Sequence, residues 1–355
     1  MAKRAFPVVD CDGHIIEASL EMLDYMPEPF KSVISGGRSA GGRLFPGLDG
    51  MHMPQARPSG AAGRERVNAS EHRMGSGEDW VAFLERAEID KAVMFTTQGL
   101  AVGIIQNPDY AVAVCRGFND YVHAAYRKVS DRLHPMALIP MQNVPEAVKE
   151  LRRAVEELGL PGAMLPTRGL PVNLGHELYW PVYEEAERLG CVLALHGGSN
   201  LNLGMEGFID NGASHILHHP LPLIINFVSF FRQGAIERFP NLKVGFMEGG
   251  AGWLAFVLDR IAREDEYRPR ASSLDAEEWV KSGNVLIGCE GSEGTLGHLV
   301  ERVGPTPFAY ASDYPHEVDA LKAEEEIDEL AHYPGLTEDD KAAVLGGNAK
   351  RFFNV

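Results

Sequence analysis

The sequence has few cysteines and no close pair among them. Cys11, Cys115, Cys191 and Cys289 are separated by long stretches of chain, which excludes the paired spacing of a zinc knuckle or a redox dithiol. We expect all four thiols to be reduced and buried, as is typical of proteins in a reducing compartment.

Long hydrophobic runs and an excess of basic residues are also missing. No run approaches the ~18 apolar residues that a membrane-spanning helix requires, and the first residues lack the apolar stretch of a signal peptide. The chain carries 33 Lys and Arg against 50 Asp and Glu, a formal net charge of −17, whereas nucleic-acid binding depends on basic residues that contact phosphates. We therefore expect a cytoplasmic protein with a small-molecule substrate, and neither nucleic acid nor a membrane as a partner.

What the 355 residues do contain is a regular alternation of short apolar runs and amphipathic stretches. Strands that alternate with helices form parallel sheets with right-handed crossovers, and eight such units close a (β/α)8 barrel, the TIM barrel. No Gly-x-Gly-x-x-Gly follows the first run, which disfavours a doubly wound sheet. The eight runs are Pro7–Asp12, Lys91–Thr96, Leu133–Pro140, Gly162–Pro166, Cys191–His196, Leu242–Glu248, Asn284–Cys289 and Pro307–Asp313. We predict one α/β domain over residues 1–355 that ends in helices over Thr337–Val355.

One long stretch does not fit the repeat. Ser35–Gly77, after the first strand, is rich in Gly, Arg, Met and Pro and has no clear period. Structureless connections of this length in a compact domain are usually lids or mobile segments. It holds six Arg against three acidic residues, so we predict either a solvated loop or a lid that helps to hold a carboxylate-bearing substrate.

Ionisable residues stand where several of the expected strands end. Asp12 and His14 lie two residues apart at the end of the first strand and therefore on one side of it; His196 ends the fifth strand and Asp313 the eighth. The C-terminal ends of barrel strands meet at one mouth. Mixed imidazole and carboxylate ligands suit Zn, Mn or Fe better than Ca or Mg. The sequence thus predicts a divalent metal held by these four residues.

Further polar residues near this mouth are candidates for catalysis or for support. Glu248, His219 and Asp313 are the candidate acids and bases. His215 shares a helix face with His219, because the two are four residues apart, whereas His218 is expected to point elsewhere. Glu17, His215, Glu290 and His316 are candidates for supporting the metal ligands or for holding a second metal.

These residues resemble the amidohydrolase superfamily, in particular the amidohydrolase family 2 branch that contains aminocarboxymuconate-semialdehyde decarboxylase and the resorcylate-type decarboxylases. The resemblance covers nearly the whole chain. The motifs that carry it are Asp12-Gly13-His14, the strand-end His196, His215-x-x-x-His219-Pro220, Glu237–Val244, Glu248-Gly249-Gly250, Ser312–His316 and Gly347-Asn348-Ala349.

The resemblance implies a (β/α)8 barrel with a divalent metal at its mouth, and the sequence departs from the family pattern at three places. Asp12 stands where the family usually has a first His. Glu248 stands where the decarboxylase pattern has a His. Pro166 and Thr167 stand at the fourth strand end, where binuclear members have a Lys, so a carbamylated-lysine bridge is not expected.

Three functions follow as alternatives. The first, favoured by Glu248, is a metal-dependent hydrolase of a small carboxylate-bearing molecule, in which the metal activates water. The second is a non-oxidative decarboxylase, a carbon–carbon lyase. The third is a dinuclear Mn/Fe oxygenase, suggested by the number of carboxylates near the mouth. The apolar stretch Leu221–Phe231 is either a homodimer face or a contact with the barrel core.

Overall fold

The computed structural model describes residues 6–36, 44–47, 76–198, 203–205, 208, 211–268, 274–291, 293–316 and 318–355. Every strand pair in this part of the chain is parallel. The strands are β1 (Val9–Ile15), β2 (Lys91–Thr96), β3 (Leu133–Pro135), β4 (Ala137–Leu138), β5 (Gly162–Pro166), β6 (Val192–His196), β7 (Lys243–Met247), β8 (Val285–Cys289) and β9 (Phe308–Tyr310). They lie in sequence order, β1 to β3 in one sheet and β4 to β9 in another.

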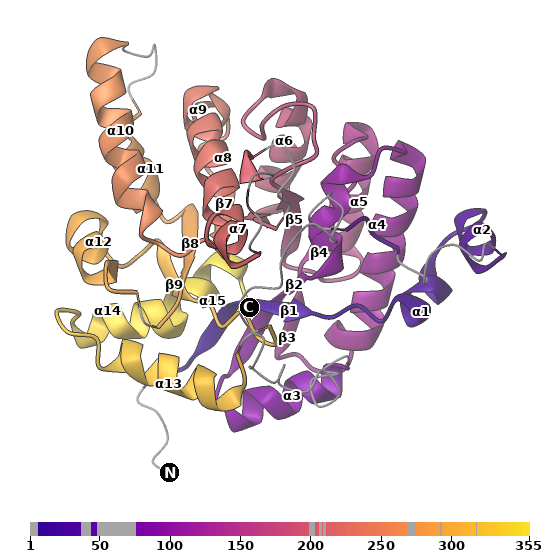
Figure 1. Ribbon diagram of the computed structural model, residues 1–355, viewed down its shortest axis with the longest axis horizontal. Coiled ribbons are helices and arrows are strands. Elements are labelled where there is room, and N and C mark those ends of the chain that lie inside the picture. The colour runs from indigo at the N-terminus through magenta and orange to yellow at the C-terminus, as the bar shows by residue number, and fades with distance from the viewer. Residues whose placement is uncertain are drawn as a thin grey trace.

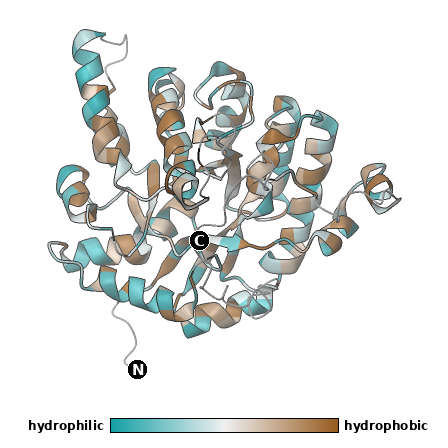
Figure 2. Ribbon diagram, viewed as in Figure 1, coloured by the Kyte–Doolittle hydropathy of each residue, from teal (hydrophilic) through white to brown (hydrophobic). Residues whose placement is uncertain are grey.

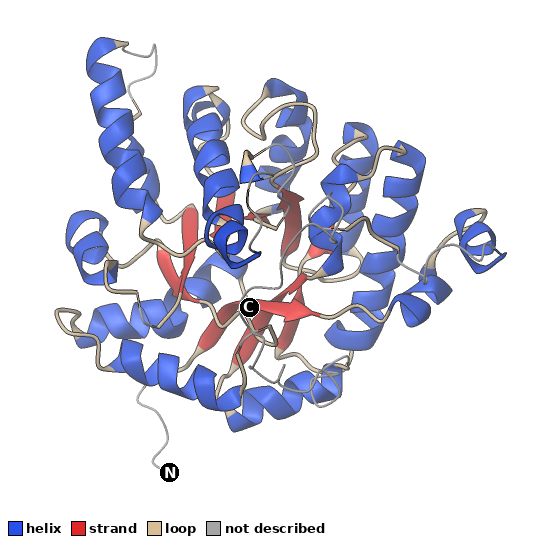
Figure 3. Cartoon of the chain, viewed as in Figure 1, coloured by secondary structure: helices blue, strands red, loops and turns tan. Residues whose placement is uncertain are grey.

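The chain is the (β/α)8 barrel that the alternation predicts, with one strand divided. The expected run Leu133–Pro140 forms β3, which pairs with β2, and β4, which pairs with β5. Met136 lies between the two and still donates its backbone N–H to Met94. The barrel is joined at its other edge by backbone hydrogen bonds from Asp313 N to Asp12 O (2.8 Å) and from His14 N to Tyr314 O (2.6 Å). Figure 3 shows the strands surrounded by helices.

Helices cover the outside of the barrel (Figure 1). The longer ones are α3 (Gly77–Arg86), α4 (Pro108–Val122), α5 (Val144–Glu156), α6 (Trp180–Leu189), α7 (Asn211–His218), α8 (Pro220–Arg232), α10 (Trp253–Tyr267), α12 (Leu296–Val303) and α13 (Ala320–Ala331). The shorter ones are α1 (Ser19–Met22), α2 (Phe30–Gly36), α9 (Ala235–Arg238), α11 (Ala276–Lys281), α14 (Glu338–Ala342) and α15 (Asn348–Phe353). In Figure 2 these helices carry both hydrophilic and hydrophobic residues, as expected of helices with one face on the barrel and one in water.

Local sequence explains where several helices begin and end. Asn107 caps α4 by accepting hydrogen bonds from the backbone of Asp109 and Tyr110, and Thr337 begins α14 with a capping box. Gly234, at a φ of 85°, separates α8 from α9, because this left-handed backbone is inexpensive only for glycine. The helical stretch therefore breaks at Gly234 rather than running on from α8 into α9.

The apolar face of α8 packs inside the chain. Leu223, Phe227, Phe230 and Phe231 are buried in the core, which favours the core contact over the homodimer face for this stretch. The four cysteines are also buried and free, as expected. No helix in the described part of the chain combines the length and apolar character needed to cross a membrane.

Most of the insertion predicted over Ser35–Gly77 lies outside the described residues. Of its described part, Ser35 belongs to α2 and Gly77 begins α3. Leu44 and Phe45 are buried, and Tyr110 Oη donates to the carbonyl of Leu44 (2.6 Å). This short piece is packed against α4, and the lid itself stays a prediction.

A buried amide connects α4 with the barrel and gives a first prediction. Asn119 Nδ2 donates to Leu138 O (2.9 Å) and to Glu150 Oε1 (2.7 Å), and its Oδ1 accepts from Leu138 N (2.8 Å). Asn119→Ala leaves the buried backbone groups of Leu138 unpaired, at ~1–3 kcal/mol each, so we expect unfolding free energy to fall by about 3 kcal/mol. Urea unfolding measures this as a lower midpoint at an unchanged slope.

Asn107→Ala is the matched control, because it removes an exposed cap on the same helix. Its expected cost is only ~1 kcal/mol. A loss for Asn119→Ala no larger than that for Asn107→Ala would contradict the role given to the buried amide.

Candidate metal centre

Two strands on different sides of the barrel bring three fully buried ligands together. Asp12 and His14 end β1, and His196 ends β6. His196 Nε2 lies 3.5 Å from Asp12 Oδ1, and His14 Nε2 lies 3.8 Å from the same oxygen. One ligand atom from each residue lies within 4.8 Å of the others. Gly13 between the two β1 ligands has no room for a side chain, because a Cβ there would collide with the ring of Trp80.

Asp313 and His316 complete this centre from the loop after β9. Asp313 Oδ1 lies 3.3 Å from His14 Nε2, and the ring centroid of His316 lies 4.4 Å from that of His14. These three residues also form a group of potential ligands. The structure thus brings together all four of the sequence-predicted ligands, with His316 beside them.

Glu248 connects the centre to His219. Its Oε2 lies 3.2 Å from His196 Nε2, and its Oε1 lies 3.1 Å from His219 Nε2. Both Glu248 and Asp313 have positive φ, 56° and 57°, a backbone region that costs ~1–3 kcal/mol for such residues and that gathers at functional sites. Burial raises the pKa of Glu248 to about 7, against the opposite effect of His196.

In His14 and His196, a contact of Nδ1 with a backbone carbonyl orients the ring and so directs Nε2, the ligand nitrogen. His14 Nδ1 lies 3.2 Å from Thr96 O, and His196 Nδ1 lies 2.9 Å from Gly197 O. With a carbonyl as partner, Nδ1 carries the hydrogen, which leaves the lone pair of Nε2 directed at the centre. This is the usual arrangement of metal-binding histidines.

The centre needs a positive charge. Among the described residues, neither oxygen of Asp12, nor His196 Nε2, nor Glu248 Oε2 forms a hydrogen bond. Burial alone would lower the pKa of His196, but Asp12 and Glu248 raise it to about 9. Buried carboxylates without a partner cost several kcal/mol. A divalent cation fits this set of imidazole nitrogens and carboxylate oxygens, which is suited to Zn, Mn or Fe.

Asp10 positions the ligands rather than facing the centre. Its buried carboxylate accepts hydrogen bonds from Ser312 N (3.0 Å), Ser312 Oγ (2.6 Å) and Asp12 N (3.2 Å). Asp10 thereby ties the strand that carries Asp12 to the loop that carries Asp313. Asp10 is not among the site residues predicted from the sequence. The one sequence signal was its place two residues before Asp12.

Two other sequence candidates lie apart from the centre. The carboxylate of Glu17 accepts hydrogen bonds from Thr96 Oγ1 and from the backbone of residues 97–99, so it holds the loop after β2. Glu290 is exposed and belongs to none of the ligand groups found among the described residues.

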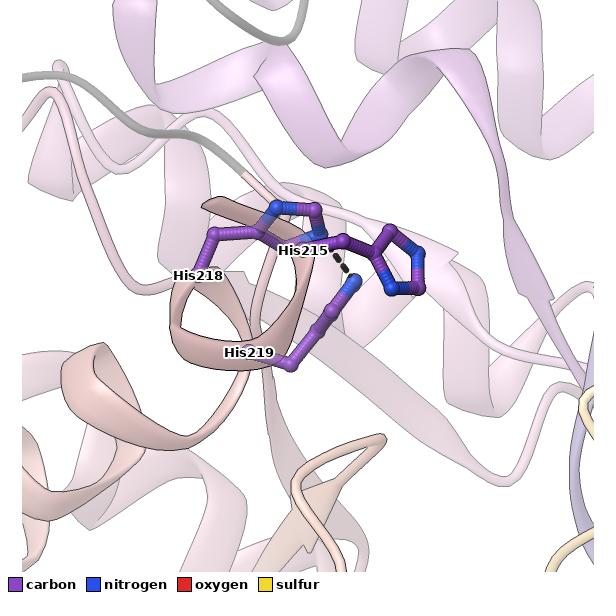
Figure 4. Close-up of side chains that lie close together, drawn as sticks. All are labelled: His215, His218 and His219. Atoms are coloured by element: carbon purple, nitrogen blue, oxygen red, sulfur yellow. Dashed lines mark hydrogen bonds between the residues drawn. The ribbon is translucent and has the colours of Figure 1, made fainter. Parts of the chain in front are cut away.

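The prediction that His218 points elsewhere is wrong. Its Nε2 contacts Nε2 of His219, and both rings lie near that of His215 (Figure 4). The helix α7 ends at His218, and the chain continues directly into His219. Because His218 lies three residues after His215, it shares the helix face of His215 and His219 instead of facing away.

Comparison with known proteins agrees with this architecture. The family model described as "Amidohydrolase" matches residues 9–355. A 2-amino-3-carboxymuconate-6-semialdehyde decarboxylase of Dictyostelium discoideum is 26% identical over 277 residues, 77% of this chain and 75% of that protein. A gamma-resorcylate decarboxylase of Rhodococcus jostii is 33% identical over 235 residues, 61% of this chain and 70% of that protein.

Two solved structures share the fold. An amidohydrolase from Mycobacterium avium subsp. paratuberculosis superposes with a TM-score of 0.78 at 18% identity, covering 99% of both chains. A 5-carboxyvanillate decarboxylase from Novosphingobium aromaticivorans superposes with a TM-score of 0.71 at 19% identity, covering 99% of this chain and 97% of that one. The second was solved with manganese and 4-hydroxy-3-methoxy-5-nitrobenzoic acid.

Proposed function

The chain belongs to the amidohydrolase family and is thus an enzyme, and we propose that it is a divalent-metal-dependent decarboxylase of a small carboxylic acid with a hydroxyl group beside its carboxylate. The sequence alone favours hydrolysis over decarboxylation, because Glu248 stands where the decarboxylase pattern has a His. The relatives named above are decarboxylases, and they favour the second alternative. The observation that carries the proposal is the pair formed by Glu248 and His219 beside the ligand set.

Asp12, His14, His196 and Asp313 would hold the metal, with Mn and Zn as the expected ions. A bound divalent cation would act as a Lewis acid that anchors the carboxylate and hydroxyl oxygens of the substrate. Nearly complete burial of Asp12, His14 and His196 keeps water from competing for these positions.

Glu248 and His219 supply the proton that decarboxylation consumes. When the bond between the substrate carbon and its carboxylate breaks, carbon dioxide leaves and the electron pair stays on that carbon. Glu248, held between His196 and His219, donates a proton to the carbon. A proton from solvent then restores Glu248 by way of His219, which takes up one proton as it passes one on. In the hydrolytic alternative Asp313 would instead take a proton from water.

The proposed reaction predicts carbon dioxide and a specific label. The Mn-loaded protein is incubated in D2O with a panel of hydroxybenzoates that includes 2,6-dihydroxybenzoate and 5-carboxyvanillate. We expect carbon dioxide and product in equal amounts, with one deuterium at the carbon that lost the carboxylate, because that hydrogen comes from a solvent-exchanging acid.

Parallel assays of the same Mn-loaded protein, with amides, lactones and thioesters and with oxygen measurement, separate the other two functions. Turnover of amides, lactones or thioesters without carbon dioxide would establish hydrolysis instead. Oxygen uptake, with loss of turnover under anaerobic conditions, would establish the oxygenase.

A further inference from the structure

Three histidine rings meet where α7 joins α8. His215, His218 and His219 each place one ring nitrogen within 4.8 Å of the others. The ring centroids are 4.7 Å apart for His215 and His218, 5.4 Å for His215 and His219, and 3.9 Å for His218 and His219. Figure 4 shows the three side chains close together at the end of α7, with the contact between His218 and His219 as a dashed line. None of them is among the four ligands of the centre described above.

The backbone holds the three rings in this arrangement. Residues three and four positions apart lie on one face of a helical turn, which places His218 and His219 beside His215. His219 is pressed against the end of β6, where a Cβ on Gly197 would lie 2.9 Å from its Nδ1. His215 is exposed, His218 half-buried and His219 buried, so the cluster is open to solvent on one side and closed on the other.

No placement of hydrogens on the ring nitrogens gives every close contact of this cluster a good hydrogen bond. His219 Nε2 contacts both His218 Nε2 and, at 3.1 Å, Glu248 Oε1. An imidazole nitrogen has one in-plane position, for a hydrogen or for a lone pair, so it cannot serve both neighbours well. In the described part of the chain, Nδ1 of His218 and Nδ1 of His219 also form no hydrogen bond.

We propose that His215, His218 and His219 form a second divalent-cation site, one that selects Zn²⁺ over Mn²⁺. Three imidazoles and a water molecule make a common tetrahedral zinc site with Zn–N distances of ~2.0–2.1 Å. Such distances separate the ligand nitrogens by ~3.3 Å, which small rotations of the three side chains can reach from the present spacing.

The two sites differ in the ions they prefer. Imidazole ligands suit Zn²⁺ and Co²⁺, whereas Mn²⁺ favours sites with carboxylate oxygens. The centre of Asp12, His14, His196 and Asp313 offers both kinds of ligand, but the three-histidine site offers only nitrogen. Zn²⁺ therefore fills both sites and Mn²⁺ only the first. A ring nitrogen of His219 that binds Zn²⁺ cannot carry a proton for Glu248, so the proton path of the proposed function belongs to the Mn²⁺-loaded protein, whose second site is empty.

Metal stoichiometry tests the proposal without any substrate. Metal-free protein is dialysed against Zn²⁺ or Mn²⁺, and the bound metal is measured by elemental analysis. We expect two equivalents of Zn²⁺ and one of Mn²⁺. Asp12→Asn is expected to keep one Zn²⁺ in the histidine site and to show the visible absorption of tetrahedral Co²⁺ when loaded with that ion.

Substitution of the exposed ligand locates the site. His215→Asn, a change at the surface that should not impair folding, is expected to bind one Zn²⁺ and to keep its Mn²⁺. His298→Asn, which removes another exposed histidine, is the matched control and should bind two Zn²⁺. One equivalent of Zn²⁺ in the unaltered protein, or two in His215→Asn, would overturn the proposal, and Asp12→Asn without Zn²⁺ would do the same.

Discussion

We expect Asp12→Asn to lower kcat/KM by about a thousandfold and to remove the metal from the catalytic centre. The carboxylate of Asp12 lies 3.5 Å from His196 Nε2 and is completely buried, so it supplies much of the negative charge that holds the cation. A bound metal stabilises the charge of the transition state by several kcal/mol. Each 1.36 kcal/mol corresponds to a tenfold change in rate, so losing this stabilisation lowers kcat/KM by a factor on the order of 10³.

Steady-state kinetics and Mn²⁺ content of the same preparation check this result. Mn²⁺ is the proper ion here, because the three-histidine site is not expected to bind it. Thermal unfolding of the metal-free variant shows whether the barrel is intact, and His298→Asn serves as the unaffected reference. Full Mn²⁺ content in Asp12→Asn would mean that Asp12 is not a ligand.

Glu248→Gln is expected to lower kcat by about 10²–10⁴, the usual contribution of a positioned general acid. The amide keeps the size of the side chain but has no proton to give to carbon. KM and Mn²⁺ content should change little, because the substitution leaves Asp12, His14, His196 and Asp313 in place. Glu248→Asp, which keeps the acid on a shorter side chain, should recover part of the rate.

The split between kcat and metal content distinguishes two roles for Glu248. A proportional loss of Mn²⁺ and activity would make Glu248 a metal ligand through Oε2, which lies 3.2 Å from His196 Nε2. A rate within twofold of the unaltered enzyme would remove Glu248 from the mechanism and leave decarboxylation without the proton donor proposed here.

The barrel, and the meeting of Asp12, His14, His196 and Asp313 at its mouth, could be predicted from local patterns. Several strand ends carry an ionisable residue, and the parallel arrangement of strands brings those ends together. The division of Leu133–Pro140 had one local signal, Pro135, which lacks the N–H that a continuous strand would donate and which ends β3. Which neighbour each half pairs with, β2 or β5, depends on the whole barrel.

Local patterns also give an incomplete account of His218 and Asp10. The spacing of four placed His215 and His219 on one helix face, but the spacing of three puts His218 on that face as well. The close packing of His219 against Gly197 then holds the three rings together. The role of Asp10 depends on a contact with Ser312, 302 positions away, which no local pattern reveals.

That contact also sets an order of events during synthesis of the chain. Asp10 lies in β1 and Ser312 in the loop after β9, so the ribosome exposes Asp12, His14 and His196 long before Asp313 exists. A cation that meets the nascent chain finds an incomplete set of ligands on an open sheet. Secure capture of the metal must therefore wait until Asp313 has been synthesised, and metal retention reports that β1 and the loop after β9 have met.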